Sequence, residues 1–595
     1  MASQPEKPRL ICAPLMAQSA EQTLNEMHQA KMEGADVVEI RLGCNPSFEP
    51  SRDLKILLEN KPIPVAVVCW SSWDGVQHEV DEKEQLQALM LAKDLGAEYI
   101  ELELEVALTL FKEDKLSQFK SSKIIVSCYL DSLTASKEDI SHLVAKMQST
   151  EADIVKLVSN AADITEIVDV FELLLISQAP VIAYCTGERG LISQLLSFKF
   201  GGVFVYGHIE GHAIPGLPSI DSLAQAYGVK NIDRNTQVFG LISKPVSHSK
   251  GPLLHNPTFR YVGYNGIYVP MFVDDLKAFF NVYPNPDFAG FSVGFPYKET
   301  IVDFCDEVHP LAQFIGAVNT IIRRPSDGKL IGYNTDCEAA ISAIEDALNE
   351  CTNRERLHSS PIKGRLFVVV GAGGAGRALA FGAKTRGARI LVFDIDFDRA
   401  KSLAAAVSGE ALSFENLLNF KPEKGAILAN ATPLGMYPNV DRIPVPKESL
   451  MDYKLVFDAV YTPRKTRLLK EAETAGAIVV SGVEMFLRQA AAQFSLFTSQ
   501  TAPEEFMRGI ILEKRKRIMA VLPRSRNEKT KRLGTSASLA RARGLDVRLA
   551  GIVGRGSLLL VAAHGRSWCF TWSLVPAGRR EREGLVLVGR KKARS

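Results

Sequence analysis

The chain has 595 residues, more than one apolar core usually spans, so two or three domains are expected. Its 46% hydrophobic and 23% charged residues are ordinary for a globular protein, and no apolar run reaches the roughly 18 residues of a membrane helix. The net charge of +2 conceals an acidic body, because the residues from Lys514 onward carry 21 Lys and Arg against 4 Asp and Glu. These features exclude a membrane span and do not favour a nucleic-acid binder.

The N-terminal sequence lacks the charged and then apolar pattern of a secretory signal, and it is too short for a long transit peptide. Nine cysteines lie far apart without a C-x-x-C pair, which favours a reducing compartment. We therefore expect a cytoplasmic protein, with a plastid location left open if the natural start is longer.

Eight short apolar runs, separated by segments of helical character, occupy residues 9–207. They are RLICAPL, DVVEIRL, PVAVVCW, YIELEL, KIIVSCY, DIVKLV, VIAYC and VFVYG. Eight alternating strand and helix units predict a (β/α)8 barrel, which we place at residues 1–225. Chemistry in this fold lies at the C-terminal ends of the strands. The side chains expected there are Glu39, Arg41, Lys156 and, just past its strand, Arg189.

Two further α/β units follow the barrel. The first, at residues 236–340, begins with TQVFGLISKPVSHSKGP and ends near LIGYNTD. The second, at residues 355–512, starts with LFVVV and GAGGAG and continues through RILVFDID, AILANAT, LVFDAVY and AIVVSG. This alternation predicts a doubly wound, Rossmann-type nucleotide-binding sheet, so the whole chain is of the α/β class.

The pattern ends in a basic stretch at residues 514–595, rich in Gly, Arg and Ser, for which we expect little stable structure. Its short apolar pieces, GSLLLVAA and GLVLVG, have no helical partners nearby. A tail for an acidic partner and a stretch that is not natural protein, such as translated intron, remain alternatives.

The glycine motif after LFVVV is the strongest general signal in the chain. Gly371, Gly373, Gly374 and Gly376 let the backbone approach a pyrophosphate at a helix N-terminus. Asp394 ends the next strand, where a carboxylate bonds the ribose hydroxyls of NAD and repels the 2′-phosphate of NADP. The alternative is that Asp394 only caps the following helix.

In the unit at 236–340, Lys298 follows GFSVGFPY, and Asp336 lies in YNTD. A lysine beside a carboxylate in a cleft can act as a general base on a hydroxyl. Without further context, a surface lysine and a structural aspartate are the better interpretation.

Several motifs add a family resemblance in the expected order: KPVSHSKGPLLHN, FPYKE, GAVNT, YNTD, GAGGAG, NATPLGM, DAVYTP and GVEMFLRQA. Residues 236–512 resemble shikimate dehydrogenase, and residues 9–512 resemble the plant bifunctional 3-dehydroquinate dehydratase/shikimate dehydrogenase. The resemblance implies that Lys298 and Asp336 are the catalytic pair. It implies as substrate ligands Ser249, Asn319, Tyr461 and Gln489, and as cofactor neighbours Thr432 and Met485.

Two departures from the family lie in the acid pocket. Where the family usually has Ser-Lys-Ser this chain has Ser249, Lys250 and Gly251, and Gly294 stands where the family has a threonine. Quinate has a hydroxyl on a saturated carbon where shikimate is flat, so it needs more room, and the two glycines resemble the quinate dehydrogenase branch. The alternative is that they only relax the backbone or weaken shikimate binding.

The cofactor loop departs as well. The family commonly has Asn-Arg-Thr where this chain has Asp394, Ile395 and Asp396, so the arginine that meets the 2′-phosphate of NADP is missing. This favours NAD, with NADP as the less favoured cofactor.

The barrel resembles a type I dehydroquinate dehydratase, which forms a Schiff base on a lysine matched here by Lys156. Glu39, Arg41 and Arg189 match substrate-binding positions, but the family histidine is replaced by Tyr129. Other family groups are replaced by Trp70, Ala213 and Leu217. Because a tyrosine is a poor proton shuttle at neutral pH, we expect a largely inactive dehydratase.

The residues together predict a quinate dehydrogenase that oxidises quinate reversibly to 3-dehydroquinate with NAD. The partners expected are small molecules, quinate, 3-dehydroquinate and shikimate, with no nucleic acid, membrane or metal. One alternative is the bifunctional dehydratase/shikimate dehydrogenase of the shikimate pathway, which uses NADP. Another is a regulator that binds a metabolite without turning it over.

Overall fold

The computed structural model describes most of the chain before residue 514. The described residues are 7–16, 18–43, 48–69, 82–131, 137–214, 216–247, 249–350, 359–513, 559–560, 570–575 and 586–591. The chain forms two compact units, Met1–Leu522 and Pro523–Ser595. Trp70, which was expected to replace a family group of the barrel site, lies outside the described residues.

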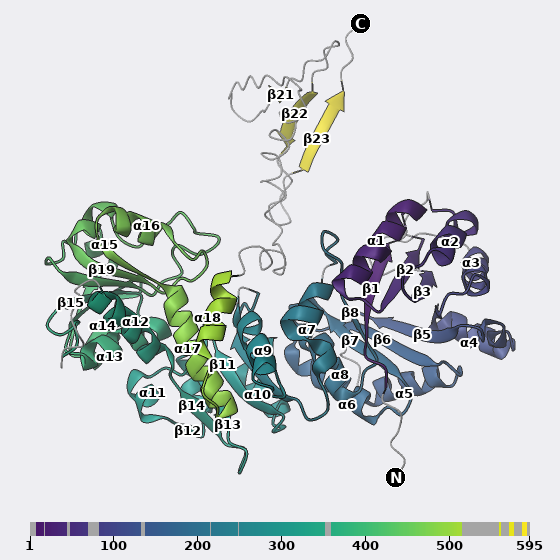
Figure 1. Cartoon of the computed structure of the whole chain (residues 1–595), viewed down its shortest axis with the longest axis horizontal. Helices are drawn as coiled ribbons and strands as arrows, with labels where there is room; N and C mark the ends of the chain where they lie inside the picture. The colour runs from purple at the N-terminus through teal and green to yellow at the C-terminus, as the bar shows by residue number, and fades with distance from the viewer. Residues whose placement is uncertain are drawn as a thin grey trace, which may run out of the picture. The chain divides into compact units, whose positions relative to one another are not determined.

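The first part of the larger unit is a nearly closed parallel barrel, as predicted (Figure 1). Its strands are β1 (Leu10–Met16), β2 (Val37–Leu42), β3 (Val65–Cys69), β4 (Tyr99–Glu103), β5 (Lys123–Leu130), β6 (Ile154–Asn160), β7 (Val181–Thr186) and β8 (Phe204–Tyr206). They pair in the order β7-β6-β5-β4-β3-β2-β1-β8, and Val203 N donates to Val181 O (3.1 Å) beside the remaining seam. Strands covered on both faces are Val- and Ile-rich throughout, which explains their near-continuous apolar runs.

Helices cover the outside of the barrel (Figure 1). They are α1 (Ala20–Glu33), α2 (Pro50–Glu59), α3 (Glu82–Asp94), α4 (Leu104–Lys112), α5 (Lys137–Gln148), α6 (Ile167–Ile176), α7 (Gly187–Leu195) and α8 (Ser197–Phe200). Short helical turns are η1 (Leu116–Phe119), η2 (Ile164–Glu166), η3 (Ser222–Tyr227) and η4 (Val229–Asn231). In α1, Ser19 accepts from Gln22 N at the start, and Gly34 adopts a left-handed conformation at the end.

The next domain is a mixed sheet in the order β10-β9-β11-β13-β14-β12. Its strands are β9 (Gln237–Ser243), β10 (Gly266–Phe272), β11 (Phe288–Val293), β12 (Glu307–Val308), β13 (Thr320–Arg323) and β14 (Leu330–Tyr333). Its helices are α9 (Gly251–Tyr261), α10 (Leu276–Val282), η5 (Thr300–Phe304), α11 (Pro310–Ile315) and α12 (Asp336–Glu350). β9, β10 and β11 run parallel, and β13 is antiparallel to β11 and β14.

The third domain is a six-stranded parallel sheet in the order β17-β16-β15-β18-β19-β20. Its strands are β15 (Leu366–Val370), β16 (Arg389–Asp394), β17 (Glu410–Ser413), β18 (Ala426–Asn430), β19 (Tyr453–Asp458) and β20 (Ile478–Ser481). Its helices are α13 (Gly374–Thr385), α14 (Phe397–Ala406), α15 (Phe414–Leu417), η6 (Lys447–Asp452), α16 (Arg467–Thr474), α17 (Gly482–Thr498) and α18 (Glu504–Glu513). The strand order reverses beside β15, the place where doubly wound sheets bind nucleotides.

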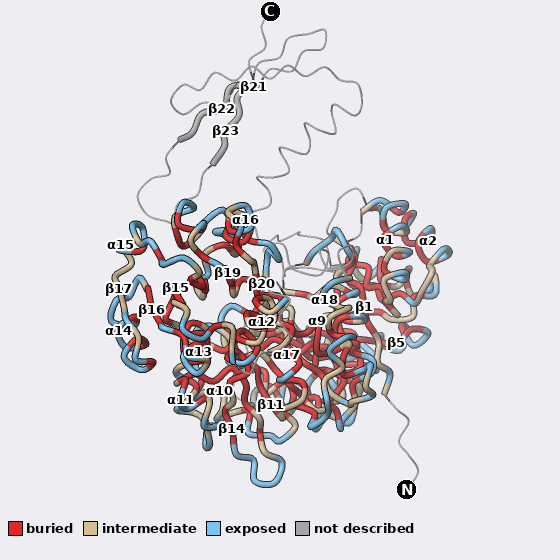
Figure 2. The backbone as a smooth tube through the Cα atoms, turned by 60° about the vertical axis from the view of Figure 1, so that its left-hand side comes forward, coloured by how far each residue is buried: buried red, intermediate tan, exposed pale blue. Residues whose placement is uncertain are grey.

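Burial follows these layers, since the strands of all three domains are largely buried and the outer helix faces are exposed (Figure 2).

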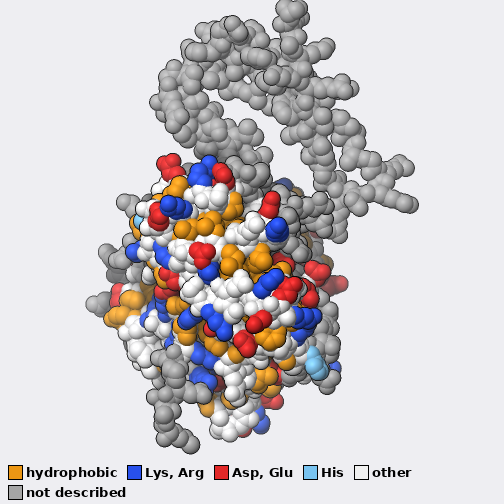
Figure 3. Space-filling view, turned by 90° about the vertical axis from the view of Figure 1, so that its right-hand side faces the viewer, with side chains coloured by type: hydrophobic (Ala, Val, Ile, Leu, Met, Phe, Trp, Pro, Cys, Tyr) orange, Lys and Arg blue, Asp and Glu red, His pale blue; other side chains and the backbone are white. Residues whose placement is uncertain are grey.

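On the face of the molecule shown in Figure 3, basic and acidic side chains are interspersed among apolar ones. Among the described residues, no helix combines the length and the apolarity that crossing a membrane requires.

Most of the predicted low-order tail lies outside the described residues. In its described part, β21 (Leu559–Leu560), β22 (Phe570–Val575) and β23 (Val586–Lys591) pair antiparallel. The apolar pieces that lack helical partners in the sequence thus find strand partners.

Candidate active site

Lys298 and Asp336 meet although they are 38 positions apart. Lys298 lies in the turn after β11, Asp336 is the first residue of α12, and Lys298 Nζ is 2.5 Å from Asp336 Oδ2. The carboxylate is 4% exposed and the lysine 22%, so the pair is shielded but reachable. This is the arrangement expected of an acid–base pair.

The residues before α12 fix Asp336 in place. Asn334 Oδ1 accepts from the backbone N–H groups of Asp336 and Cys337 (3.1 Å each), which caps the helix. Asn319, a predicted substrate ligand, donates to Thr335 Oγ1 and accepts from Thr335 N, both at 2.8 Å. The YNTD and GAVNT motifs therefore form one network beside the Lys298–Asp336 pair.

The glycine-rich turn after β15 has the backbone shape that the sequence predicts. Gly371 has a φ of +102°, and a Cβ at Gly376 would lie 1.8 Å from Gly371 O. Side chains at these positions would block the turn that opens α13. The close approach leaves the N-terminus of α13 bare, which fits the pyrophosphate of a dinucleotide.

The glycine turn also touches the substrate domain. A Cβ at Gly374 would lie 2.7 Å from Lys298 Cβ, so the glycine turn packs against the stem of Lys298. Beside it, Glu299 pairs with Arg399 of α14 at 2.6 Å. Neither Glu299 nor Arg399 was singled out from the sequence, since one charge in each of two distant segments carries no signal before folding.

Asp394 lies at the end of β16, where it was expected. Its Oδ2 accepts from Ala372 N (2.5 Å), and its Oδ1 accepts from Asp396 N (2.9 Å). Asp394 thus ties the glycine turn to the next loop. The neighbouring Asp396 accepts from the N–H groups of Asp398 and Arg399 and caps α14, so the capping role proposed as an alternative for Asp394 belongs to Asp396.

The two pocket glycines lie where other side chains fill the space. A Cβ at Gly251 would be 2.6 Å from Tyr268 Cε1, and a Cβ at Gly294 would be 2.6 Å from Ser243 Oγ. The prediction that these glycines leave open room therefore needs a correction. Tyr268 and Ser243 take up at least part of that room, and a sequence pattern could not show it because both come from other strands.

The remaining predicted ligands lie on neighbouring elements. Ser249 Oγ accepts from Gly251 N (3.1 Å), the Tyr461 ring stacks on Phe486 of α17 (4.9 Å), and Gln489 Nε2 donates to Phe486 O (3.1 Å).

Two predicted cofactor neighbours lie in the nucleotide domain. Thr432 donates to Asn430 Oδ1 (2.7 Å) after β18, and Met485 is buried in α17.

The barrel places its predicted residues in a fully buried charge cluster. Lys156 Nζ is 2.7 Å from Glu39 and 2.8 Å from Glu101, and Arg41 Nε donates to Glu39 at 2.7 Å. Tyr129 donates to Glu101 at 2.9 Å. The sequence did not indicate Glu101, because its strand, YIELEL, contains more than one glutamate. Which glutamate points into the barrel is decided only when the barrel forms.

These neighbours hold Lys156 in its charged form. Burial alone lowers the pKa of a lysine, but the carboxylates of Glu101 and Glu39 outweigh it and raise the pKa of Lys156 well above its ordinary value. Burial likewise raises the pKa of Glu39, yet the charges of Lys156 and Arg41 prevail and lower it to about 2. Burial and then Glu101 raise the pKa of Tyr129.

Aromatic and apolar side chains cover this cluster. The Tyr206 ring centroid lies 4.5 Å from Lys156 Nζ, and Tyr184, Tyr206 and Leu217 belong to one buried cluster against which Tyr129 packs. Ala213 is exposed. Beneath these rings, Lys156 is 0% exposed.

Arg189, just past β7, contacts the dehydrogenase substrate domain. Its guanidinium binds Asp274 of the dehydrogenase substrate domain (2.5 and 3.0 Å) and lies over Phe272 at 4.5 Å. That Arg189 lines the substrate site of the barrel stays a prediction.

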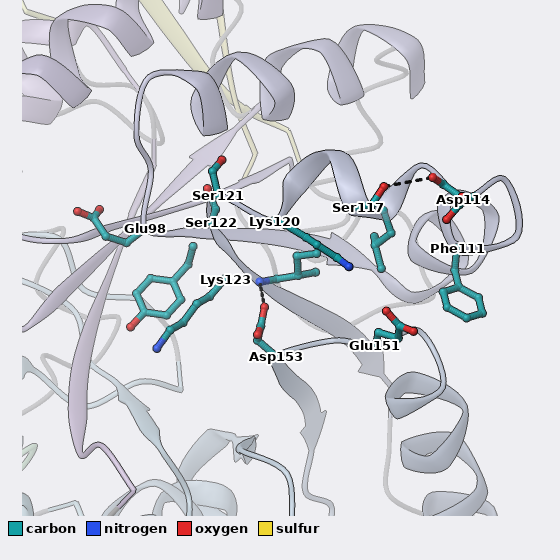
Figure 4. Close-up of a pocket in the computed structure, with 13 residues that line it drawn as sticks. Glu98, Phe111, Asp114, Ser117, Lys120, Ser121, Ser122, Lys123, Glu151 and Asp153 are labelled. Carbon is teal, nitrogen blue, oxygen red and sulfur yellow. Dashed lines mark hydrogen bonds between the residues drawn. The ribbon is translucent and has the colours of Figure 1, made fainter.

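A cavity of about 700 Å³ opens elsewhere in the barrel (Figure 4). Its lining includes Glu98 just before β4, Lys120 just after η1, Lys123 at the start of β5, and Asp153 just before β6. It therefore lies at the N-terminal strand ends, opposite the end that carries chemistry in (β/α)8 barrels. Its mixed charges indicate no particular ligand.

A doubly wound sheet with a glycine turn, packed against a lysine–aspartate pair, defines a dehydrogenase unit, here joined to a (β/α)8 barrel. Three family models match the chain: type I 3-dehydroquinase at residues 11–234, the shikimate dehydrogenase substrate binding domain at 241–321, and the shikimate 5′-dehydrogenase C-terminal domain at 482–512.

The chain belongs to the family of bifunctional 3-dehydroquinate dehydratase/shikimate dehydrogenases. It is 48% identical over 504 residues to the chloroplastic enzyme of that name from Arabidopsis thaliana, covering 84% of each chain. It is 38% identical over 294 residues to the shikimate dehydrogenase (NADP+) of Methanopyrus kandleri, covering 48% of this chain and 97% of that one.

Solved structures match the dehydrogenase half. A shikimate dehydrogenase in complex with NADP+ has a TM-score of 0.42 at 34% identity, covering 48% of this chain and 97% of that one. The quinate dehydrogenase of Corynebacterium glutamicum in complex with NAD has a TM-score of 0.40 at 28% identity, covering 47% and 99%.

Proposed function

We propose that the chain is a quinate dehydrogenase that oxidises quinate reversibly to 3-dehydroquinate with NAD, and that its dehydratase barrel is largely inactive. The observation that carries the dehydrogenase activity is the Lys298–Asp336 pair, 2.5 Å apart and packed against the glycine turn. Lys298, in its neutral form, takes the proton of the substrate hydroxyl, and Asp336 holds the lysine in position and balances the positive charge that this proton brings.

The residues present fit a dinucleotide. Gly371, Gly374 and Gly376 lie where a Cβ would collide with neighbouring atoms, and Asp394 ends β16 as a ribose ligand. When bound, NAD supplies the hydride acceptor. Ile395 is 85% exposed and offers no charge to a 2′-phosphate, which supports NAD over NADP.

Quinate is supported by the two hydroxyls missing at Gly251 and Gly294. Tyr268 and Ser243 pack against these positions, so the glycines do not simply enlarge the pocket. They support quinate only through a changed shape and polarity of the pocket. Low dehydratase activity is supported by Tyr129, and by the buried, charged state of Lys156, since only a neutral amine attacks a ketone.

A second candidate is the bifunctional dehydratase/shikimate dehydrogenase with NADP. The relatives favour it, because the Arabidopsis protein is named for both activities and the Methanopyrus protein for shikimate and NADP+. Two residues of this chain also favour it. Lys156 is the lysine that the dehydratase needs, and Arg399 is a cation at the start of α14 that could meet the 2′-phosphate of NADP. Under this candidate a plastid location, as in the name of the Arabidopsis relative, replaces the cytoplasm.

The test is initial reduced-cofactor formation by the full chain with quinate and with shikimate, each with NAD and with NADP. Lys298→Met is the control and lowers every rate by about 10²- to 10⁴-fold if the pair is catalytic. The highest kcat/KM for quinate with NAD supports the proposal, and the highest for shikimate with NADP supports the second candidate. Turnover of neither acid leaves a metabolite-binding regulator.

The dehydratase is tested separately by adding 3-dehydroquinate and borohydride to the full chain and mapping any reduced adduct. We expect no adduct on Lys156 at neutral pH. An adduct there, together with loss of water from the substrate, contradicts an inactive barrel.

A further inference from the structure

The turn that follows β10 carries one carboxylate that binds a cation from each of two domains. Arg189, in the first turn of α7 of the barrel, donates to both oxygens of Asp274, at 2.5 and 3.0 Å. Lys244 of the dehydrogenase donates to the same carboxylate at 2.7 Å. Both cations also lie over the Phe272 ring, at 4.5 and 5.9 Å from its centre. Asp274 thus joins the barrel to the dehydrogenase.

The geometry of the contact between Arg189 and Asp274 fixes direction as well as distance. A guanidinium that meets a carboxylate with two hydrogen bonds holds it in one orientation. Both side chains are partly buried, so solvent screens the pair only in part. The hydrogen bonds from Arg189, and then from Lys244, outweigh burial and keep the pKa of Asp274 below its ordinary value, so the carboxylate is charged at neutral pH.

Two segments of the predicted dehydrogenase site contact this turn. Lys244 directly follows β9 and opens the loop that leads to α9, where the predicted acid pocket begins. The Tyr297 hydroxyl donates to Val273 O at 2.7 Å, and Tyr297 directly precedes Lys298. The side chain of Asp274 therefore binds the substrate loop, and the backbone beside it binds the neighbour of the predicted catalytic lysine.

A shift of this turn would move both segments together. They are joined to each other as well, because Lys244 N donates to Phe295 O at 3.0 Å. From the barrel, α7 packs against β10, so Arg189 meets the turn from an element that is itself held in place. A displacement of about 1 Å at a site can cost about 10²-fold in rate, so a contact that fixes this turn affects the chemistry.

We propose that Arg189 of the barrel is a positioning residue of the dehydrogenase. It holds Asp274, and this carboxylate with its turn orients the loop at Lys244 and the segment 297–298. The inference rests on the proposed dehydrogenase function, but not on which acid or dinucleotide is used. It gives the barrel a part in the dehydrogenase reaction that is independent of dehydratase activity.

The test compares Arg189→Met, Arg189→Lys and Asp287→Asn in the full chain, with the acid and the dinucleotide that the native chain uses. We expect Arg189→Met to raise KM for the acid and to lower kcat, with kcat/KM reduced about 3- to 30-fold and KM for the dinucleotide within about 2-fold. Arg189→Lys keeps a cation without the fork and recovers part of the loss. Asp287→Asn removes another ion pair between barrel and dehydrogenase, with Lys199, and is expected to leave these constants unchanged.

A double-variant cycle separates positioning from a general loss of stability. Asp274→Asn is expected to lower kcat/KM at least as much as Arg189→Met, because it weakens the bond to Lys244 as well. Arg189→Met added to Asp274→Asn is expected to have little further effect, since both changes act through one carboxylate. If Arg189→Met does not fold, Arg189→Lys takes its place in the cycle.

Unchanged KM and kcat in the Arg189 variants, with only a lowered Tm, overturn the positioning role, because a merely structural ion pair does not move these constants. Additive effects of the Arg189 and Asp274 changes overturn it as well. Failure of the dehydrogenase function is a different outcome, since the native chain itself then turns over neither acid.

Discussion

Ser243 and Gly294 share one small volume at the ends of β9 and β11. Ser243 Oγ bonds the carbonyls of Phe295 (2.9 Å) and Pro245 (3.1 Å) and stands 2.6 Å from where a Cβ of Gly294 would be. Neither residue has a strained backbone. A Ser243 hydroxyl and a side chain at position 294 therefore exclude each other only because they would occupy the same space.

This exclusion predicts a non-additive pair. Gly294→Thr alone is expected to destabilise the chain by about 1 to 3 kcal/mol, and Ser243→Gly in the same chain is expected to recover most of that loss. The measurement is the free energy of unfolding of both single variants and the double variant, with kcat/KM for quinate and shikimate. Additive effects contradict the shared volume, and only the double variant gives a fair test of substrate choice.

The residue Ile395 allows a test of the choice between NAD and NADP. Its exposed side chain stands beside Asp394, at the expected ribose end of the cofactor site. Asp394→Asn with Ile395→Arg is expected to raise the kcat/KM ratio of NADP to NAD at least about 10-fold, because a repelling carboxylate is replaced and a phosphate-binding fork is added. Asp398→Asn, an exposed change in the first turn of α14, serves as the control. An unchanged ratio contradicts the assignment of this loop to the ribose.

At the scale of elements, Asp458 joins β19 to the start of α16. Its carboxylate is 0% exposed and accepts from Asn430 Nδ2 (2.9 Å), Val460 N (3.1 Å) and Thr466 Oγ1 (2.5 Å). Burial outweighs these hydrogen bonds and raises the pKa of Asp458 to about 6.

A raised carboxyl pKa means that the folded chain binds its proton more tightly than the unfolded chain. The stability from this proton is complete below about pH 4 and is lost as pH rises through about 6. The free energy of unfolding of the native chain, relative to Asp458→Asn, is therefore expected to fall by up to about 3 kcal/mol between pH 4 and 7. Chemical unfolding at each pH measures it, and exposed Asp441→Asn should track the native chain.

At the scale of the whole molecule, the barrel supports the dehydrogenase through contacts between them. The Tyr283 hydroxyl donates to Ile164 O (2.7 Å), Lys199 pairs with Asp287 (3.0 Å), and Arg189 pairs with Asp274. A barrel whose catalysis is reduced can thus persist as a folding partner, provided its buried charges stay balanced.

Lys156→Met tests this balance. Removing the lysine leaves Glu39 and Glu101 facing each other without their shared cation, so we expect the barrel to lose about 3 to 5 kcal/mol of stability. Dehydrogenase kcat at low temperature should stay near its native value, because Lys156 touches no predicted dehydrogenase residue. Thermal unfolding with a parallel activity assay measures both, and exposed Lys146→Met is the control. A loss of dehydrogenase kcat that parallels the loss of stability contradicts the separation of the barrel site from the dehydrogenase site.

Local patterns in the sequence predict the eight barrel strands and the doubly wound sheet, and the family resemblance predicts the Lys298–Asp336 pair. Apolar periodicity and glycine placement are local properties that the chain displays before folding. Three contacts could not be predicted before folding: Ser243 and Tyr268 pack against the two glycines, Glu101 completes the Lys156 cluster, and Arg189 binds Asp274. Each of these contacts joins side chains from different strands or domains, and their meeting depends on sheet order, register and facing, which no local pattern specifies.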